Sequence, residues 1–486
     1  MIYLFKTRPA AKGLLAAAIT VFLMGCVSSP SKDSSESSSV GGNNFKEGHI
    51  SSTNGVHEYM LSNGLKVIVK EDHRAPVVVS QVWYKAGSSY EVNGSTGVAH
   101  VLEHMMFKGT QKLEANEFSR VIAANGGREN AFTGQDYTAY FQQLEKSRLP
   151  ISFELEADRM ANLNLKAEDF KKEIKVVMEE RRMRTDDKPR SLTYEHFIAT
   201  AFVNSPYHHP IIGWMDDLEN MNVDDMRDWY ANWYAPNNAT LVVAGDVNHK
   251  DVFELAKKHY GPVKPRAIPK VKPQREFEQR GIRRIIVKAP AQVPYFIMGY
   301  KAPVVNTAKL DWEPYALDML AGILDGGDSA RFSRELVRGQ EIATSAGAGY
   351  DMHSRLGDLL LFDGTPATGK TVEDLEKAIR AQLEKLKTEL VSQQELDRIK
   401  AQVVAGKVYE KDSIFYQAMQ IGTLETVGLD WRLMDEYVDR LKQVTPEQVQ
   451  AVAKKYLVDD HLTVAVLEPQ PSNSASQPNK GDHNAH

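Results

Sequence analysis

The sequence contains very little cysteine and no excess of basic residues. Cys26 is the single cysteine among 486 residues, so the chain cannot form an internal disulfide bond and must be stabilised by buried apolar cores. Lys and Arg number 59 against 64 Asp and Glu, which gives a net charge of −5. Without a basic field to attract phosphates, we expect no nucleic-acid partner. A hydrophobic content of 42% is ordinary for a globular protein.

The first 25 residues have the pattern of a secretory signal peptide. Three basic residues precede an apolar run of 12 residues, Gly13 to Met24, which is shorter than the ~20 residues that a membrane-spanning helix needs. The run leads into Leu-Met-Gly-Cys26, which resembles the bacterial lipoprotein box, where the cysteine is lipidated and becomes the new N-terminus. We therefore expect a lipid anchor on Cys26 and a location on the periplasmic side of the bacterial envelope. Val27, in place of Asp, favours the outer membrane by the same resemblance.

Two further segments contain very few large apolar residues. Residues 26–55 follow the signal peptide, residues 470–486 end the chain, and both are rich in Ser and Asn. Such segments cannot bury enough apolar surface to offset the entropy lost on folding. We expect the first to be a disordered tether and the second a disordered tail.

The chain between these segments contains two similar halves. Residues 234–246 (YAPNNATLVVAGD) end the first half with a polar turn and a predicted strand. Residues 456–468 (YLVDDHLTVAVLE) repeat this pattern 222 residues later. Predicted strands at 66–70 and 284–288 have nearly the same offset, so we predict two domains of one α+β design. The predicted parts are residues 56–263, a Pro- and Lys-rich linker at 264–274, and residues 275–469.

A short predicted helix combines an apolar stripe with two histidines. Four apolar residues from 98 to 105 follow the i, i+3, i+4, i+7 spacing of a helix, which Ser95 or Thr96 could cap. His100, Glu103 and His104 then share the other face. Histidines at i and i+4 lie about 6 Å apart, so both can reach one metal ion. Glu103 is suited to act as a base for metal-bound water. The alternative is a solvated helix face that happens to carry two histidines.

A closed zinc site requires a further protein ligand. A second predicted helix, residues 167–184, carries Glu173 and Glu180 two turns apart beside its buried stripe. Glu180 follows His104 by 76 residues. Most other acids of this helix fit a solvated charged surface.

The order His-x-x-Glu-His, followed by Glu180, resembles the signature of the insulinase/pitrilysin peptidases, also called inverzincins. Chain length and order resemble the mitochondrial-processing-peptidase branch of that family. The resemblance implies two homologous domains, each with a mixed sheet and helices. It also implies one Zn²⁺ per chain, held by His100, His104 and Glu180, with Glu103 as the base. Glu173 would orient a ligand by hydrogen bonding. The implied activity is that of a zinc endopeptidase acting on peptide substrates.

A second stretch supports the same resemblance. Residues 126–133 (GGRENAFT), followed by 136–141 (DYTAYF), match the part of the family that forms a sheet edge beside the metal. The resemblance implies that a substrate adds to this edge as an extra strand, whose backbone hydrogen bonds carry little sequence information. The edge residues would be Asn130, Ala131, Phe132 and Thr133.

One family feature is missing from the second half. Self-sufficient members carry an Arg followed seven residues later by a Tyr, which contact the substrate and stabilise the oxyanion. Here Val337 and Thr344 occupy these positions, and neither can replace a guanidinium or a phenol as a donor. We therefore expect a paralogous partner subunit, in a heterodimer, to supply the pair. The alternative is that Arg331 or another donor of this chain serves instead.

Two other classes of function compete with the peptidase. A peptide-binding or assembly subunit could keep the fold without turnover, and a zinc ion could have a purely structural role. Glu103 and all three proposed ligands are present, which favours catalysis over both. Among the other histidines, His57, His73 and His353 show no ligand spacing, so we expect no metal role for them.

Overall fold

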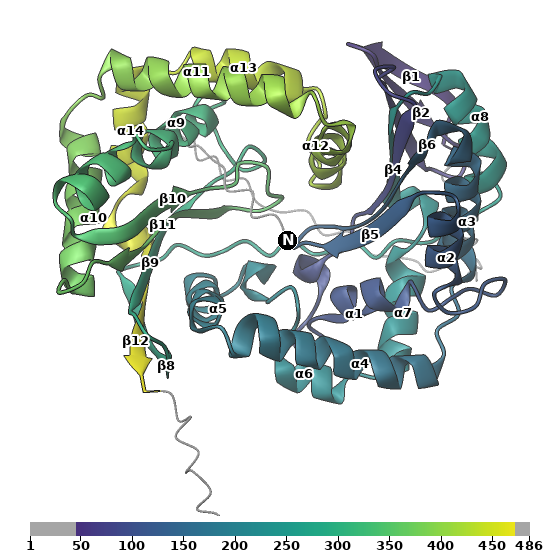
Figure 1. The fold of residues 1–486 in the computed structure, drawn as a ribbon, viewed down its shortest axis with the longest axis horizontal. Helices are drawn as coiled ribbons and strands as arrows, with labels where there is room; N and C mark the ends of the chain where they lie inside the picture. The colour runs from purple at the N-terminus through teal and green to yellow at the C-terminus, as the bar shows by residue number, and fades with distance from the viewer. Residues whose placement is uncertain (1–44, 472–486) are drawn as a thin grey trace, which may run out of the picture.

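The computed structural model describes residues 45–471, which form two halves, each built on one β-sheet (Figure 1). The predicted signal peptide, the lipidation site Cys26 and residues 472–486 of the predicted tail lie outside the described residues. No helix between residues 45 and 471 has the length and apolar content needed to cross a membrane.

The first sheet has seven strands in the order β1-β2-β3-β7-β4-β6-β5. These strands are β1 (Gly48–Thr53), β2 (Val56–Met60), β3 (Lys66–Glu71), β4 (Val77–Tyr84), β5 (Arg128–Thr133), β6 (Thr138–Glu145) and β7 (Ala239–Gly245). The second sheet has five strands in the order β10-β11-β9-β12-β8. They are β8 (Arg283–Pro290), β9 (Tyr295–Ala302), β10 (Ala343–Gly349), β11 (Asp358–Pro366) and β12 (Leu462–Gln470).

Five strands of the first sheet have the same arrangement as the whole second sheet. Read from one side, β3-β7-β4-β6-β5 corresponds to β8-β12-β9-β11-β10. The first pair of each set, β3 with β7 and β8 with β12, is parallel. The later pairs are all antiparallel. This shared topology confirms the prediction of two α+β domains of one design, each with a mixed sheet.

Helices cover both sheets. The first half contains α1 (Val98–Met105), α2 (Glu117–Ala124), α3 (Leu149–Asn162), α4 (Ala167–Arg181), α5 (Pro189–Ala201), α6 (Met215–Asn220), α7 (Val223–Trp233) and α8 (His249–Tyr260). The second half contains α9 (Glu313–Asp325), α10 (Val372–Thr388), α11 (Gln393–Glu410), α12 (Ile414–Thr426), α13 (Leu433–Lys442) and α14 (Pro446–Tyr456).

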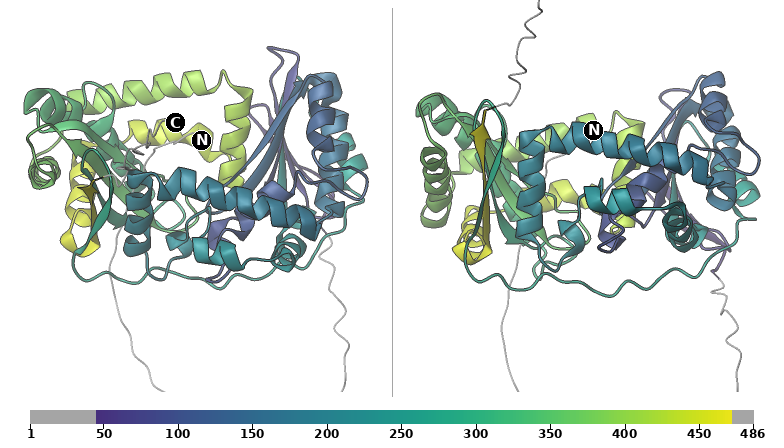
Figure 2. Two further views of the ribbon diagram at one scale, coloured as in Figure 1. Left: turned by 60° about the horizontal axis from the view of Figure 1, so that its bottom comes forward. Right: turned by 90° about the horizontal axis from the view of Figure 1, so that it is seen from below.

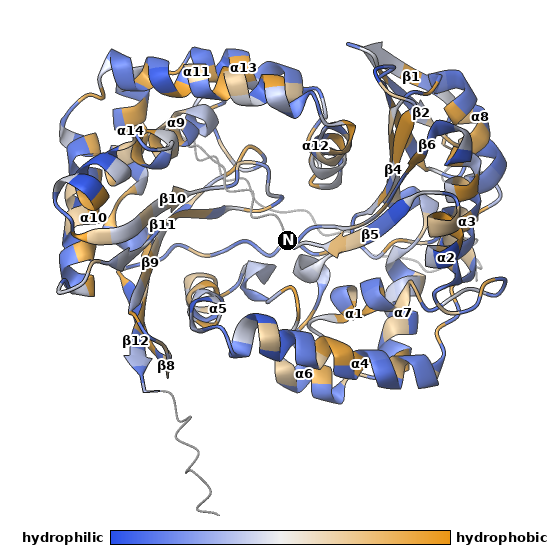
Figure 3. Cartoon of the chain, viewed as in Figure 1, coloured by the Kyte–Doolittle hydropathy of each residue, from blue (hydrophilic) through white to orange (hydrophobic). Residues whose placement is uncertain are grey.

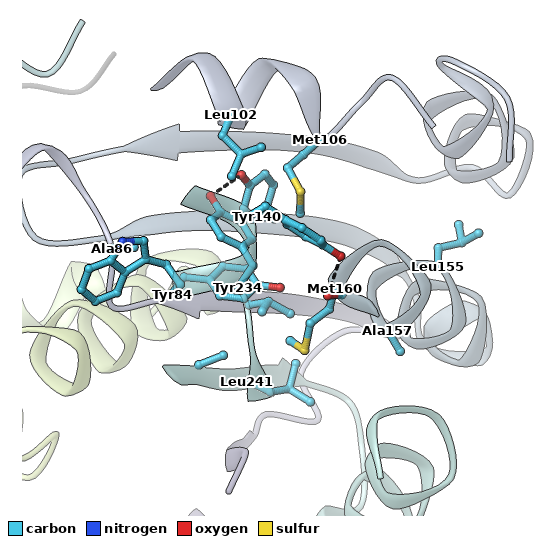
Figure 4. Packing of buried hydrophobic residues seen from close by; sticks show 14 of the residues in the cluster. Tyr84, Ala86, Leu102, Met106, Tyr140, Leu155, Ala157, Met160, Tyr234 and Leu241 are labelled. Carbon is cyan, nitrogen blue, oxygen red and sulfur yellow. Dashed lines mark hydrogen bonds between the residues drawn. The ribbon is translucent and has the colours of Figure 1, made fainter. Parts of the chain in front are cut away.

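The first core fixes the position of α1 on its sheet. Leu102 of α1 and the adjacent Met106 are buried against Tyr140 of β6 and against Tyr234 (Figure 4). The two tyrosine hydroxyls lie 3.0 Å apart and hydrogen bond to each other, so these polar atoms are satisfied inside the core. With its apolar stripe held here, α1 turns its histidine face away from the core.

Each half contributes one helix that packs on the sheet of the other half (Figure 1, Figure 2). α12 of the second half packs on β4 and β7 of the first sheet, where Ile421 is fully buried. α5 of the first half packs on β8 and β12 of the second sheet, where Phe197 is fully buried. Gly422 permits the close approach of α12, because a Cβ there would lie 2.0 Å from the Trp83 ring. Each sheet is therefore covered on both faces, and hydrophobic residues are frequent along its strands (Figure 3).

Three predicted boundaries need correction. Residues 48–53, assigned to the disordered tether, form β1, because β2 supplies backbone partners and Arg432 of the second half donates to Ser51. The connection between the halves, predicted as 264–274, runs from 261 to 282 without helix or strand. Within it, Glu276 accepts a hydrogen bond from the backbone N–H of Ser205 at 3.0 Å. The last strand also includes Gln470, the first residue of the predicted tail.

Candidate metal centre

Helix α1 begins differently from the sequence prediction. Gly97, with φ +87°, occupies the N-cap, and neither Ser95 nor Thr96 caps the helix. The carboxylate of Glu91 accepts hydrogen bonds from the backbone N–H groups of Gly97 at 2.8 Å and Ala99 at 2.9 Å. An acidic group at a helix N-terminus interacts favourably with the helix dipole. The predicted cap was wrong because the actual partner comes from a preceding loop rather than from the helix start.

The structure brings His100, His104 and Glu180 together. One ligand atom from each of the three residues lies within 4.8 Å of the others. His104 Nε2 is 3.4 Å from Glu180 Oε2, and the two imidazole centroids are 4.8 Å apart. The predicted helices position them: α1 carries both histidines, and α4 packs against α1 with Glu180 in its last turn.

Glu173 fixes the orientation of His104. Its Oε1 lies 3.0 Å from His104 Nδ1, and its Oε2 lies 2.6 Å from Lys108 Nζ. Burial alone would lower the pKa of His104, but the hydrogen bonds to Glu173 and Glu180 outweigh it and raise the pKa to about 9. Binding a metal ion through Nε2 requires the deprotonated imidazole, so metal binding would release a proton from His104.

His100 and Glu180 provide the other two donors. Burial lowers the pKa of His100, so its imidazole is neutral at pH 7, which is the form that binds metals. Its Nδ1 is buried and has no hydrogen-bond partner among residues 45–471. The hydrogen bond with His104 lowers the pKa of Glu180, which remains a carboxylate. Two imidazoles that can bind in their neutral form and one carboxylate make a set of ligands that suits zinc.

Glu103 also lies on α1, next to these residues, but its hydrogen-bond partner is on strand β5. Its Oε2 accepts a hydrogen bond from the Thr133 hydroxyl at 2.5 Å. Burial raises the pKa of Glu103 above the usual value for a carboxyl group, toward neutral pH. A carboxylate with a raised pKa is suited to accept and return a proton during catalysis.

Thr133 is the last residue of β5, the strand at one edge of the first sheet. Asn130, Ala131, Phe132 and Thr133 pair with β6 on one side only. β5, to which a substrate is predicted to add, is therefore an open edge of the sheet, and it contacts α1. Its use by a substrate stays a prediction.

The second half anchors the turn that follows β5. Arg355 donates from Nε to Asp136 Oδ1 at 3.0 Å and from Nη2 to Ser89 Oγ at 2.7 Å. The hydroxyl of Tyr207 donates to the same aspartate. These buried charge-assisted bonds hold the end of the edge strand in a fixed position relative to α1.

Three contacts of the site were not predicted from the sequence. Lys108 binds Glu173, Arg184 forms an ion pair with Glu180, and the Thr133 hydroxyl binds Glu103. Lys108 follows His104 by four residues and Arg184 follows Glu180 by four residues, so the i, i+4 rule could have identified both as neighbours. The Thr133 contact joins a helix to a strand, and local spacing contains no signal for it.

The second half offers no oxyanion donor at the two family positions. Val337 packs against the core of the second half, and the Thr344 hydroxyl donates to the Thr365 carbonyl at 3.2 Å. Arg331, the alternative donor, is bound by both oxygens of Glu395 at 2.7 and 3.0 Å. A bidentate pair of this kind holds the guanidinium in place.

Comparisons with known proteins agree with this geometry. Residues 66–214 match the insulinase family (peptidase family M16), and residues 220–403 match the peptidase M16 inactive domain. The zinc protease PqqE of Helicobacter pylori is 35% identical over 414 residues, which cover 84% of this chain and 92% of that protein.

Solved structures show the same fold. A protease from Helicobacter pylori matches with a TM-score of 0.80 and 34% identity, over 87% of this chain and 100% of that chain. The periplasmic protease PqqL of Escherichia coli matches with a TM-score of 0.73 and 18% identity. That match covers 87% of this chain and 48% of the longer PqqL chain.

Proposed function

Because this chain belongs to the insulinase family of peptidases, family M16, we propose that it is a zinc-dependent endopeptidase that hydrolyses peptides or small unfolded proteins in the bacterial periplasm. The observation that supports this most directly is the arrangement of four groups. His100, His104 and Glu180 converge, and the half-buried carboxylate of Glu103 lies on the same helix face as the two histidines. A purely structural metal site or a peptide-binding subunit would not need Glu103.

The side chains of the site would have separate roles in hydrolysis. His100, His104 and Glu180 would hold a zinc ion, which would supply Lewis-acid chemistry toward the scissile carbonyl and a water molecule. The carboxylate of Glu103, held by the hydrogen bond from the Thr133 hydroxyl to Oε2, would accept the water proton. The oxygen of that water then bonds to the carbonyl carbon. As the C–N bond breaks, Glu103 returns the proton to the leaving amine.

The free edge of β5 would align the peptide. An extended segment that pairs with residues 130–133 satisfies the backbone groups of this edge. Since Thr133 ends the strand and binds Glu103, a peptide in that register brings one of its carbonyls to the proposed base. Backbone pairing does not select a sequence, so specificity must come from side-chain contacts.

We further propose that a paralogous subunit completes the site in a heterodimer. Val337 and Thr344 cannot donate to an oxyanion as Arg and Tyr do, and Arg331 is held by Glu395. A second copy of this chain would lack the same donors. The E. coli PqqL chain is about twice the length of the region matched here, which is compatible with two such parts working together.

We also propose that a lipid on Cys26 anchors the protein at the periplasmic side of the envelope, at the outer membrane. The support is the sequence Leu-Met-Gly-Cys that ends the apolar run. Replacing Cys26 with serine removes the thiol that lipidation requires. We expect the Cys26→Ser protein to lose incorporation of a labelled fatty acid and to move from the membrane to the soluble fraction. An unchanged membrane fraction without label would contradict the lipid anchor.

Metal removal tests the proposed activity. We expect dialysis against a strong chelator to abolish cleavage of a mixture of quenched fluorescent peptides, and stoichiometric Zn²⁺ to restore it. The matched control is His104→Ala, which removes a ligand and should not regain activity with zinc. Cleavage that persists in the chelated protein would show that the activity does not use this centre.

A further inference from the structure

A second group of two histidines and one glutamate lies in the first half, away from the centre on α1 and α4. His57 of β2, Glu71 of β3 and His249 at the start of α8 each offer one ligand atom, and these atoms lie within 4.8 Å of one another. Figure 1 places β2 and α8 at the outer side of the first sheet, well separated from α1 and α4. The two groups share no residue.

The packing of α8 explains why these three residues meet. β2 and β3 pair antiparallel, with His57 opposite Val69. Val69 is fully buried in the core that also contains Val252 of α8. Residues on one face of a strand recur every second position, so Glu71 lies on the same face as Val69 and is diagonal to His57. His249, as the first residue of α8, completes the group at the end of this core.

Hydrogen bonds orient all three side chains. Nδ1 of His57 is 2.7 Å from the Ser52 hydroxyl, and Nδ1 of His249 bonds to the Tyr59 hydroxyl. Oε1 of Glu71 accepts the backbone N–H of His249 at 2.7 Å. The atoms left to bind an ion are Nε2 of each imidazole and Oε2 of Glu71, which lies 3.7 Å from His73 Nε2. Binding histidines through one nitrogen while a polar group holds the other is the usual arrangement at protein metal sites.

The two rings are already close together. The imidazoles of His57 and His249 are stacked, with centroids 3.6 Å apart and planes at 1°. Burial, together with the nearby charge of His249, lowers the pKa of His57 and favours its neutral form. An ion in the plane of both rings requires a rotation of the side chains from this stacked arrangement. His57 and His249 are both half-buried, so neither imidazole is enclosed by the core.

We propose that His57, Glu71 and His249 form a second site for a divalent transition-metal ion, of the zinc class by its donor set. The ion would connect strands β2 and β3 to the first turn of α8. Two imidazoles and one carboxylate are the same donor types as in the centre on α1 and α4. His73 lies next to this group, with its Nε2 3.7 Å from Glu71 Oε2 and its Nδ1 2.6 Å from Asp246 Oδ1, but it is not one of the three residues whose ligand atoms converge.

Counting metal ions in separate backgrounds tests this site. The full-length protein is stripped of metal and equilibrated with Zn²⁺, and bound zinc is measured by mass spectrometry after gel filtration. We expect two ions per chain in the wild type and one in the variant His100→Ala/His104→Ala. That remaining ion should disappear when His57→Ala and His249→Ala are added. The matched control His196→Ala removes an exposed histidine and should leave both ions bound.

A conservative variant distinguishes loss of the metal site from loss of the fold. Glu71→Gln keeps an oxygen to accept the His249 N–H but loses the charge that a cation needs. We expect Glu71→Gln to bind one zinc ion per chain. When a chromophoric chelator competes for the bound zinc, the wild type should release zinc in two phases. Glu71→Gln should lack only the phase that corresponds to the weaker site. One ion in the wild type, or two ions in the folded His57→Ala/His249→Ala protein, would overturn the proposal.

Thermal unfolding provides a readout that is independent of peptidase activity. A ligand that binds the native state alone raises Tm with its concentration. In the His100→Ala/His104→Ala background, added Zn²⁺ should raise Tm, and Glu71→Gln should remove this rise. A rise that survives Glu71→Gln would show that the stabilising ion binds elsewhere.

Discussion

Replacing Glu103 with glutamine is expected to lower kcat for peptide hydrolysis by about 100- to 10,000-fold, the range that positioned acid–base groups contribute. Glutamine is nearly isosteric and can still accept the Thr133 hydroxyl, so α1 and β5 should keep their contact. It cannot accept the proton of the attacking water, however. Since His100, His104 and Glu180 are untouched, the bound zinc at this centre should remain. Steady-state kinetics and zinc analysis of the same samples measure both effects.

The matched control for this substitution is Glu179→Gln. Glu179 lies beside Glu180 on α4 but is exposed and forms an ion pair with Arg182. An exposed pair of this type contributes little, so the control should retain wild-type kcat and wild-type zinc. Near wild-type turnover by Glu103→Gln would exclude Glu103 as the base. Loss of zinc from it would instead assign Glu103 to the metal ligands.

Adding a paralogous subunit that carries the Arg–Tyr pair is expected to raise kcat by about 100- to 1,000-fold, the value of one oxyanion donor. The isolated chain has no such donor at Val337 or Thr344, and Arg331 is bound by Glu395. Turnover is measured while the subunit is titrated against a fixed amount of this chain. The increase should saturate at one subunit per chain.

The control for the titration is the same subunit with its Arg replaced by alanine and its Tyr by phenylalanine. It should bind equally well, as judged by gel filtration, but leave turnover unchanged. If the intact subunit forms a complex without any increase in turnover, this chain does not depend on a partner for oxyanion donors. Equal stimulation by both forms would mean that the subunit acts by stabilising this chain.

Local features of the fold and the site could be predicted from the sequence. The i, i+4 spacing of His100 and His104 on an amphipathic helix depends only on helix geometry, and the structure forms that helix. The strands β3 and β8 and their offset followed from short apolar runs at equivalent positions. The assignment of Glu180 as a ligand, in contrast, rests on the family resemblance, because periodicity does not distinguish it from the other acids of α4.

Long-range features could not be predicted in the same way. α5 and α12 each pack on the sheet of the other half, and no local pattern in the sequence indicates this partner. The polar strand β1 lacks an apolar pattern because its partners are backbone groups and Arg432. His57 and His249 are far apart in sequence, so their meeting depends on how α8 docks on β2 and β3. Tertiary packing decides each of these cases.

The most direct test of the peptidase is cleavage of a quenched fluorescent peptide mixture by the purified, zinc-loaded protein, with Glu103→Gln as the blank. We predict cleavage by the wild type, alone or with its paralogous subunit, and none by the variant. A folded, zinc-loaded wild type that cleaves nothing in either condition would contradict catalysis at His100, His104 and Glu180. The fold would then serve peptide binding.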